Sequence, residues 1–209
     1  SSEIMYSCRD NAAKLFGSEN PENIIFTLNC TTALNTVIKG ILKQGDHAVI
    51  SSLEHNAVVR PLETLKKNKI EYSVAECVPY DDEQTIENFR KQFKSNTKLV
   101  ICTHASNVFG IKLPIERIGA LCRLNGILFC VDAAQSAGTA DINLSDSCID
   151  FLCTAGHKGL YGPMGTGLLI INCETTPDSL IQGGTGSDSA NLNQPENCLL
   201  YTSPSPRDS

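Results

Sequence analysis

The sequence predicts an α/β protein with a mainly parallel sheet that helices cover on both faces. Short β-rich apolar segments alternate with amphipathic helical stretches along most of the chain. Strands separated by helices of about 10 to 15 residues imply βαβ crossovers, which produce parallel pairing. At 209 residues, the chain is long enough for one large α/β domain or two small ones.

The first half of the chain opens with a strand at 24–28 and a helix at 31–42. The helix is predicted because its apolar residues fall on one face, namely Leu34, Val37, Ile38, Ile41 and Leu42. The sequence Gln44-Gly45-Asp46 ends it. The elements that follow are a strand at 47–51, a helix at 56–68, a strand at 70–77, a helix at 83–93 and a strand at 98–103.

The second half begins with a helix at 114–124. Pro114 is placed to start it, and Ile115, Ile118, Leu121 and Cys122 line one side. Strands are predicted at 126–132, 150–154 and 167–172. Ligands of such sheets bind at the carboxyl ends of the strands, so the residues after each strand are the candidates for a site.

The domain organisation predicted is one large domain at 1–197, incomplete at both ends, and a tail at 198–209. The tail is Ser/Pro-rich and has no apolar periodicity, so we expect it to be a non-native extension or disordered. The chain begins without Met and without a basic region followed by an apolar one, which indicates processing or a fragment.

Composition excludes several classes. The net charge of -6 is spread along the chain, which argues against nucleic acid or an anionic membrane as a partner. No apolar run is long enough to span a bilayer. The 10 cysteines are too dilute for a disulfide scaffold, and the absence of a CxxC pair gives no metal site. We therefore expect reduced thiols in a cytoplasmic protein.

The strongest chemical signal is Lys158, which follows a predicted strand within TAGHKGLYGP. Partial desolvation favours the neutral amine, a nucleophile that can form a Schiff base, and the glycines would let a flat ligand approach the backbone. The alternative is a solvated surface lysine. Asp132 ends another apolar strand in VDAAQSAG, where a buried carboxylate needs a cation or a strong donor. A helix N-cap is the alternative for Asp132.

Three weaker signals follow other strands. Asn29-Cys30-Thr31-Thr32 begins a helix and could bind phosphate, although an ordinary N-cap is the commoner role. His55 could stack on a planar ligand or move a proton, or could be a surface or structural histidine. Asn107 offers a donor and an acceptor, although alone it favours a turn.

Taken together, these segments resemble the class V aminotransferase-fold family of pyridoxal phosphate (PLP) enzymes, most closely its cysteine desulfurase and selenocysteine lyase-like branch. The resemblance spans about residues 1–197. It rests on an ordered set of motifs, namely TTALN, SSLEHNAVVRPL, THASNVFGIKLPI, VDAAQSAG, TAGHKGLYGP and GGTGSDS. It implies the large domain of a three-layer, fold-type-I PLP enzyme that lacks the small C-terminal domain.

The resemblance also implies roles for individual residues. Lys158 would carry the cofactor and move the proton at the substrate Cα, while Asp132 would pair with the pyridinium nitrogen. Further cofactor contacts would come from the ring-stacking His55, which is also a catalytic candidate, and from Gln135, Asn107, His157, Thr31 and the turn 30–32. Thr32 and Ala155 depart from residues common in the family, so weaker phosphate binding is expected unless Thr154 or a partner chain compensates.

The function implied is removal of sulfur from L-cysteine to give alanine and an enzyme persulfide. A homodimer and a sulfur acceptor in iron–sulfur cluster assembly are the implied partners. Because the family's substrate-binding arginine and nucleophilic cysteine lie in the small domain, we expect the chain alone to be inactive. The alternatives are a class V aminotransferase, a β-elimination lyase and a non-catalytic PLP-binding remnant. A nucleotide-binding domain is disfavoured, because no GxGxxG follows the first strand.

Overall fold

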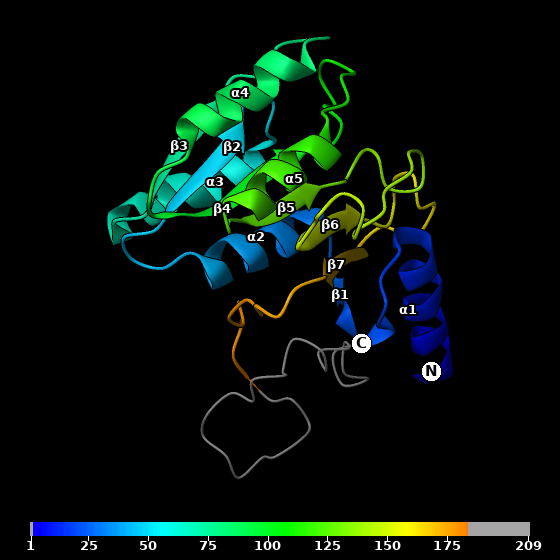
Figure 1. Cartoon of the computed structure of the whole chain (residues 1–209). Helices are drawn as coiled ribbons and strands as arrows, with labels where there is room; N and C mark the ends of the chain where they lie inside the picture. The colour runs from blue at the N-terminus through cyan, green and yellow to red at the C-terminus, as the bar shows by residue number, and fades with distance from the viewer. Residues whose placement is uncertain (1, 184–209) are drawn as a thin grey trace.

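A single seven-stranded sheet forms the centre of the computed structural model, which describes residues 2–183 (Figure 1). The strands run in the order β1-β7-β6-β5-β4-β2-β3. Strand β7 is antiparallel to β1 and to β6, and all other neighbouring pairs are parallel. The bounds are β1 Ile24–Thr27, β2 His47–Ser51, β3 Glu71–Ala75, β4 Thr97–Thr103, β5 Leu128–Asp132, β6 Phe151–Ala155 and β7 Gly167–Ile171. The predicted α/β class with a mainly parallel sheet is confirmed.

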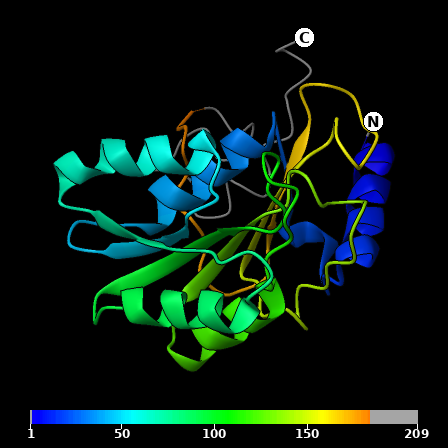
Figure 2. The same cartoon turned by 90° about the horizontal axis from the view of Figure 1, so that it is seen from above.

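Helices cover both faces of the sheet, as the view from above shows (Figure 2). The helices α2 (Cys30–Ile41) and α3 (Asn56–Leu65) pack on one face. The other face is covered by α1 (Ser2–Phe16), α4 (Asp82–Gln92) and α5 (Ile115–Leu124). The two short 3-10 helices are Pro21–Asn23 and Lys66–Asn68. The three layers therefore enclose two apolar cores, one on each side of the sheet.

Alternation along the strands distributes side chains between the two cores. In β5, Phe129 and Val131 join the core under α1, α4 and α5, while Cys130 joins the core under α2 and α3. Phe129 and Phe151 are fully buried, and burying a side chain of this size contributes about 2 to 3 kcal/mol. The continuous apolar runs read from the sequence are strands buried on both faces.

Several details differ from the sequence-based expectation: the strands expected at 70–77 and 126–132 are shorter, at Glu71–Ala75 and Leu128–Asp132, and most other ends shift by one residue. The helix expected at 56–68 ends as α3 at Leu65, because a 3-10 turn follows and Lys69 adopts a left-handed backbone with φ 59. Pro114 is the N-cap of α5 and not its first residue. Helix α1 was not predicted, since only Ala12, Ala13 and Phe16 of its residues join the core.

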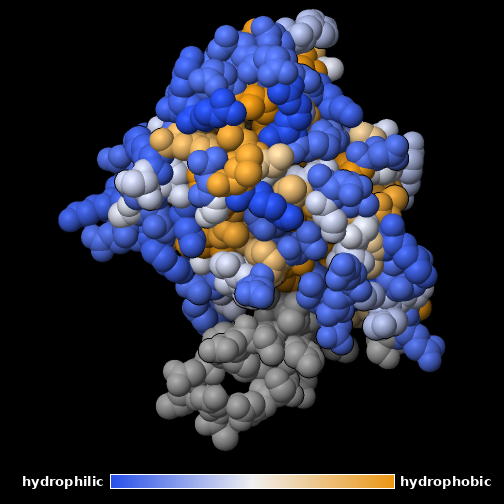
Figure 3. Space-filling view, viewed as in Figure 1, coloured by the Kyte–Doolittle hydropathy of each residue, from blue (hydrophilic) through white to orange (hydrophobic). Residues whose placement is uncertain are grey.

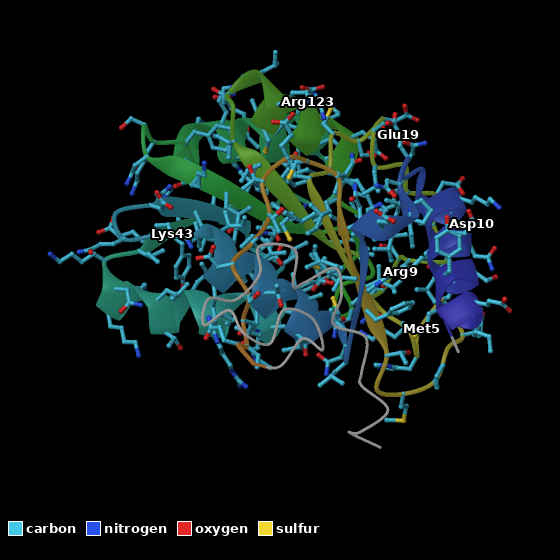
Figure 4. All side chains as sticks on the ribbon, turned by 90° about the horizontal axis from the view of Figure 1, so that it is seen from below. Met5, Arg9, Asp10, Glu19, Lys43 and Arg123 are labelled. Carbon is cyan, nitrogen blue, oxygen red and sulfur yellow. The ribbon has the colours of Figure 1, made fainter. Side chains whose placement is uncertain are left out.

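Helix α1 lies beside the sheet edge formed by β1. The guanidinium of Arg9 stands over the ring of Phe26 at 5.4 Å from the ring centroid, a cation–π contact. Figure 4 shows Arg9 on the side of α1 that faces the sheet.

Hydrophilic residues predominate on the face drawn in Figure 3, with apolar patches between them. Among the described residues, no helix has both the length and the apolar character to cross a membrane. The predicted tail at 198–209 lies outside the described residues.

Candidate functional site

The residues predicted for the site follow the carboxyl ends of five strands, β1, β2, β4, β5 and β6. Strands β2, β4, β5 and β6 are parallel to one another. Strands β1 and β6 are both antiparallel to β7, so β1 runs in the same direction as these four. The carboxyl ends of all five strands therefore lie at one edge of the sheet. Helix α2 lies over β5, β6 and β7, which brings its N-terminus to this edge. The fold therefore gathers the predicted residues at one edge, although they are far apart in sequence.

Asp132 is the buried acid of this edge. It is the last residue of β5, it is 5% exposed, and it pairs with Cys153 of β6 in the sheet register. Its Oδ1 accepts a hydrogen bond from the Ala134 N–H at 2.9 Å and one from the Cys30 thiol at 3.3 Å. Both of these bonds fall on Oδ1, so Oδ2 is available to a donor on a ligand.

Cys30 connects Asp132 to helix α2, of which it is the first residue. Burial raises the pKa of its thiol well above the ordinary value, and the negative charge and hydrogen bond of Asp132 raise it further. The positive charge of Lys158 acts in the opposite direction. Cys30 is therefore a neutral S–H donor at this position, and the three side chains belong to one electrostatic environment.

Lys158 lies in the turn after β6, with its side chain partly buried. This turn packs against the turn after β5, and glycines make the approach possible. A Cβ on Gly159 would lie 2.4 Å from the Ala137 carbonyl oxygen, and one on Gly138, whose φ is +80, would lie 2.3 Å from the Gly159 carbonyl oxygen. Gly159 therefore lets the lysine turn pack against the aspartate turn, and the predicted approach of a flat ligand to these glycines stays a prediction.

The N-terminus of α2 is capped by Asn29, whose Oδ1 accepts from the Thr32 N–H at 2.8 Å. The first amide groups of a helix lack intrahelical partners, so the N–H groups of Cys30 and Thr31 can bind an anion. Thr31 is exposed and Thr32 is partly buried. Thr154 does not compensate for Ala155, because Cys153 and Ala155 face α2 and the intervening Thr154 therefore points to the other face of the sheet.

The remaining predicted residues form the exposed rim of this edge. His55 is the N-cap of α3, and its Nδ1 accepts from the Ala57 N–H at 3.1 Å, so a neutral His55 carries its proton on Nε2. Asn107 lies in the loop after β4, Gln135 in the turn after β5 and His157 beside Lys158, and all three are exposed. They share the edge with Asp132, and the roles predicted for them stay predictions.

Two buried groups at this edge were missed in the sequence. The carboxyl of Glu54, the residue before His55, accepts from the Thr103 N–H at 2.6 Å. His104 follows β4, and its Nδ1 lies 2.9 Å from the Ser136 hydroxyl. Glu54 stands in SSLEHNAVV next to a chosen residue, so a signal was present, whereas nothing local marks His104 as buried.

The donor set matches the chemistry of PLP. Lys158 follows β6, and Asp132 ends the neighbouring strand β5, so an amine and a carboxylate lie at adjacent strand ends. The free amide groups at the start of α2 suit a phosphate. Cys30 leaves one oxygen of Asp132 available to a ring N–H. No group of metal-binding side chains occurs among residues 2–183.

Comparison with known proteins supports the same cofactor chemistry. The family model described as Aminotransferase class-V matches residues 1–198. The cysteine desulfurase IscS of Ruthia magnifica is 35% identical over 173 residues, which are 81% of this chain and 42% of that protein.

Solved structures give a similar result. The apo structure of a cysteine desulfurase from Thermococcus onnurineus NA1 superimposes with a TM-score of 0.79 at 33% identity, over 93% of this chain and 51% of that one. The structure of SspA in complex with cysteine gives a TM-score of 0.77 at 28% identity, over 95% and 58%. The chain thus spans about half the length of the proteins that it matches.

Proposed function

We propose that this chain, which belongs to the class V aminotransferase family, is the cofactor-binding part of a cysteine desulfurase. The cysteine desulfurases of this family depend on PLP. The substrate is L-cysteine, and the products are alanine and a persulfide on an enzyme cysteine. The observation that carries the proposal is the placement of Lys158 and Asp132 after neighbouring strands, in a chain similar to desulfurases.

PLP, when bound, withdraws electrons from the substrate Cα and so makes its proton acidic. The Nζ of Lys158 would hold the cofactor and would move that proton. The carboxylate of Asp132 would keep the proton on the ring nitrogen, and its Oδ1 accepts from Cys30 and Ala134. His55 would cover the ring face, and Gln135 and Asn107 would orient polar groups of cofactor or substrate.

The phosphate group of the cofactor would be held at the start of α2. The amide groups of Cys30 and Thr31 would donate to it, and Thr31, Thr32 and His157 would contribute side-chain donors. Asn29 caps the helix through the Thr32 N–H and so keeps this turn in shape.

The proposal extends to partners and location. The whole protein is proposed to be a homodimer in the cytoplasm that passes sulfur to an acceptor for iron–sulfur cluster assembly, and its relatives named cysteine desulfurase IscS support the transfer of sulfur. The 209 residues alone are proposed to bind PLP without turnover, because no motif of this sequence matches the family's substrate-binding arginine or nucleophilic cysteine.

Borohydride trapping tests the cofactor site. The chain is incubated with PLP, reduced with borohydride, digested and analysed by mass spectrometry. The cofactor mass is expected on Lys158 and is lost in Lys158→Ala, whereas Lys39→Ala, at an exposed position on α2, retains it. Labelling of another lysine in the unmodified chain would refute the assignment.

Product analysis tests the reaction in a chain extended through its natural reading frame. Alanine from cysteine, with sulfide that appears only when an added dithiol reduces the enzyme persulfide, supports a desulfurase. An oxo acid with no free sulfide indicates a transaminase, and pyruvate with sulfide indicates a β-elimination lyase. PLP binding without any product identifies a non-catalytic protein.

A further inference from the structure

The carboxyl group of Glu54 links the ends of two strands of the candidate site, β2 and β4. It lies in the turn between β2 and α3, directly before His55. Its Oε1 accepts hydrogen bonds from the Thr103 N–H at 2.6 Å and from the Ser51 hydroxyl. Thr103 ends β4 and pairs in register with Asp132 of β5. Glu54 therefore attaches the turn that carries His55 to the strand end beside Asp132.

The surroundings of Glu54 favour an uncharged carboxyl group. Its second oxygen, Oε2, is buried and finds no hydrogen-bond partner within residues 2–183. A buried carboxylate with one oxygen unpaired costs several kcal/mol more than the neutral acid. The titratable groups that face it are Asp132 on β5, Cys102 on β4 and Cys77 after β3, none of them a cation.

The pKa of Glu54 agrees with this geometry. Burial raises it from 4.5 to about 8, and the charge of Asp132 acts in the same direction. The hydrogen bonds from Ser51 and Thr103 lower it only in part. Near neutral pH the group is therefore protonated in the folded chain.

We propose that Glu54 is a positioning residue that works as a neutral acid, holding the His55 turn on the end of β4 without adding a second negative charge beside Asp132. The inference rests on the proposed PLP site. An ionised glutamate here would repel both Asp132 and the anionic phosphate of the cofactor. A residue without a hydrogen-bond acceptor would leave the Thr103 N–H without this partner, and the turn that carries His55 would lose its attachment to β4.

The first test measures the dissociation constant of PLP by absorbance titration at pH 7. Glu54→Ala loses the acceptor for Thr103 and Ser51, so its dissociation constant is expected to rise by about tenfold or more. Glu54→Gln keeps a neutral acceptor of the same shape and should stay within about threefold of the wild type. Glu76→Gln, the same change at a nearby exposed residue, is the control.

The second test follows the melting temperature of the cofactor-free chain with pH. A raised pKa in the folded state means that the stability from Glu54 is complete below pH 4.5 and is lost as the pH rises through about 8. The side chain in Glu54→Gln does not titrate. The melting temperature of this variant should therefore rise relative to that of the wild type between pH 5 and pH 9. Glu76→Gln should show no such gain.

The outcomes separate the two proposals. If the melting temperatures of the wild type and of Glu54→Gln changed equally with pH, the proposal that Glu54 is a neutral acid would be wrong. A folded Glu54→Gln that binds PLP as weakly as Glu54→Ala would show that the charge is needed, and a Glu54→Ala with wild-type affinity would remove the positioning role. A wild-type chain that binds no PLP refutes the proposed function and the positioning role with it, while the melting profiles still decide the charge state.

Discussion

His104 makes the folded chain sensitive to acid. Its side chain is fully buried after β4, with Nδ1 at 2.9 Å from the Ser136 hydroxyl and Nε2 without a partner among the described residues. Its pKa is lowered from 6.5 to about 4, mainly by burial and in part by the charge of Lys112, while Glu116 acts in the opposite direction. Protonation would place a cation in the core with one N–H unpaired, so the folded state keeps the imidazole neutral.

The magnitude follows from proton linkage. Because the folded pKa lies below the unfolded one, the stability from a neutral His104 is complete above pH 6.5 and is lost as the pH falls towards about 4. With these two values, the loss is about 1 kcal/mol at pH 6 and about 2 kcal/mol at pH 5, relative to pH 7.5. Two kcal/mol is a large fraction of the stability of an ordinary domain.

Urea unfolding of the cofactor-free chain at pH 7.5, 6 and 5 measures this loss. His104→Gln cannot titrate in this range, so its free energy of unfolding should fall by about 2 kcal/mol less between pH 7.5 and pH 5 than that of the wild type. His47 is also buried, and burial lowers its pKa as well. His47→Gln therefore measures how much of the acid loss comes from this second histidine. The same acid loss in wild type and His104→Gln would refute the reasoning.

Two further substitutions test contacts that support the site. Gly119→Ala would raise helix propensity in α5 by about 1 kcal/mol, but its Cβ would lie 1.9 Å from the Ser147 carbonyl oxygen, so a net loss in the free energy of unfolding measured with urea is expected, and a net gain would refute the close packing. Asn29→Ala removes the cap of α2 and should cost about 1 kcal/mol by the same assay, while Asn29→Asp should retain most of it; a cost shared by both variants would show that the side-chain oxygen is not the cap.

The sequence was sufficient for the elements whose signal is local. The strand at His47–Ser51 has its predicted bounds, and α2 and α5 differ from theirs by one residue at their ends. These segments carry repeated apolar residues at fixed spacing, so each residue adds to the same assignment. Helix α1 carries little of this pattern, because much of its surface is exposed, and it was missed. The antiparallel sense of β7 has no local signal at all, since it depends on which neighbours the strand meets.

The site could be predicted only as a set of strand ends. The rule that ligands bind where parallel strands end indicated Lys158, Asp132 and His55, and the structure brings their strand ends to one edge. The rule does not say which polar group meets which. Cys30 and Asp132 are 102 residues apart in sequence, and their hydrogen bond exists only because α2 crosses over the sheet to β5.

Protonation states were the least predictable feature, because burial decides them and burial is a property of the whole fold. Glu54 and Asp132 are both acids after a strand, yet they differ in their partners. Asp132 accepts from a thiol and from an amide N–H, whereas Glu54 meets two donors on one oxygen and, within residues 2–183, none on the other. Burial raises the pKa of Glu54, and the charge of Asp132 acts in the same direction, so the neutral form of Glu54 is favoured. The division of roles between them therefore follows from tertiary packing, with Asp132 available to a ring nitrogen and Glu54 holding the turn.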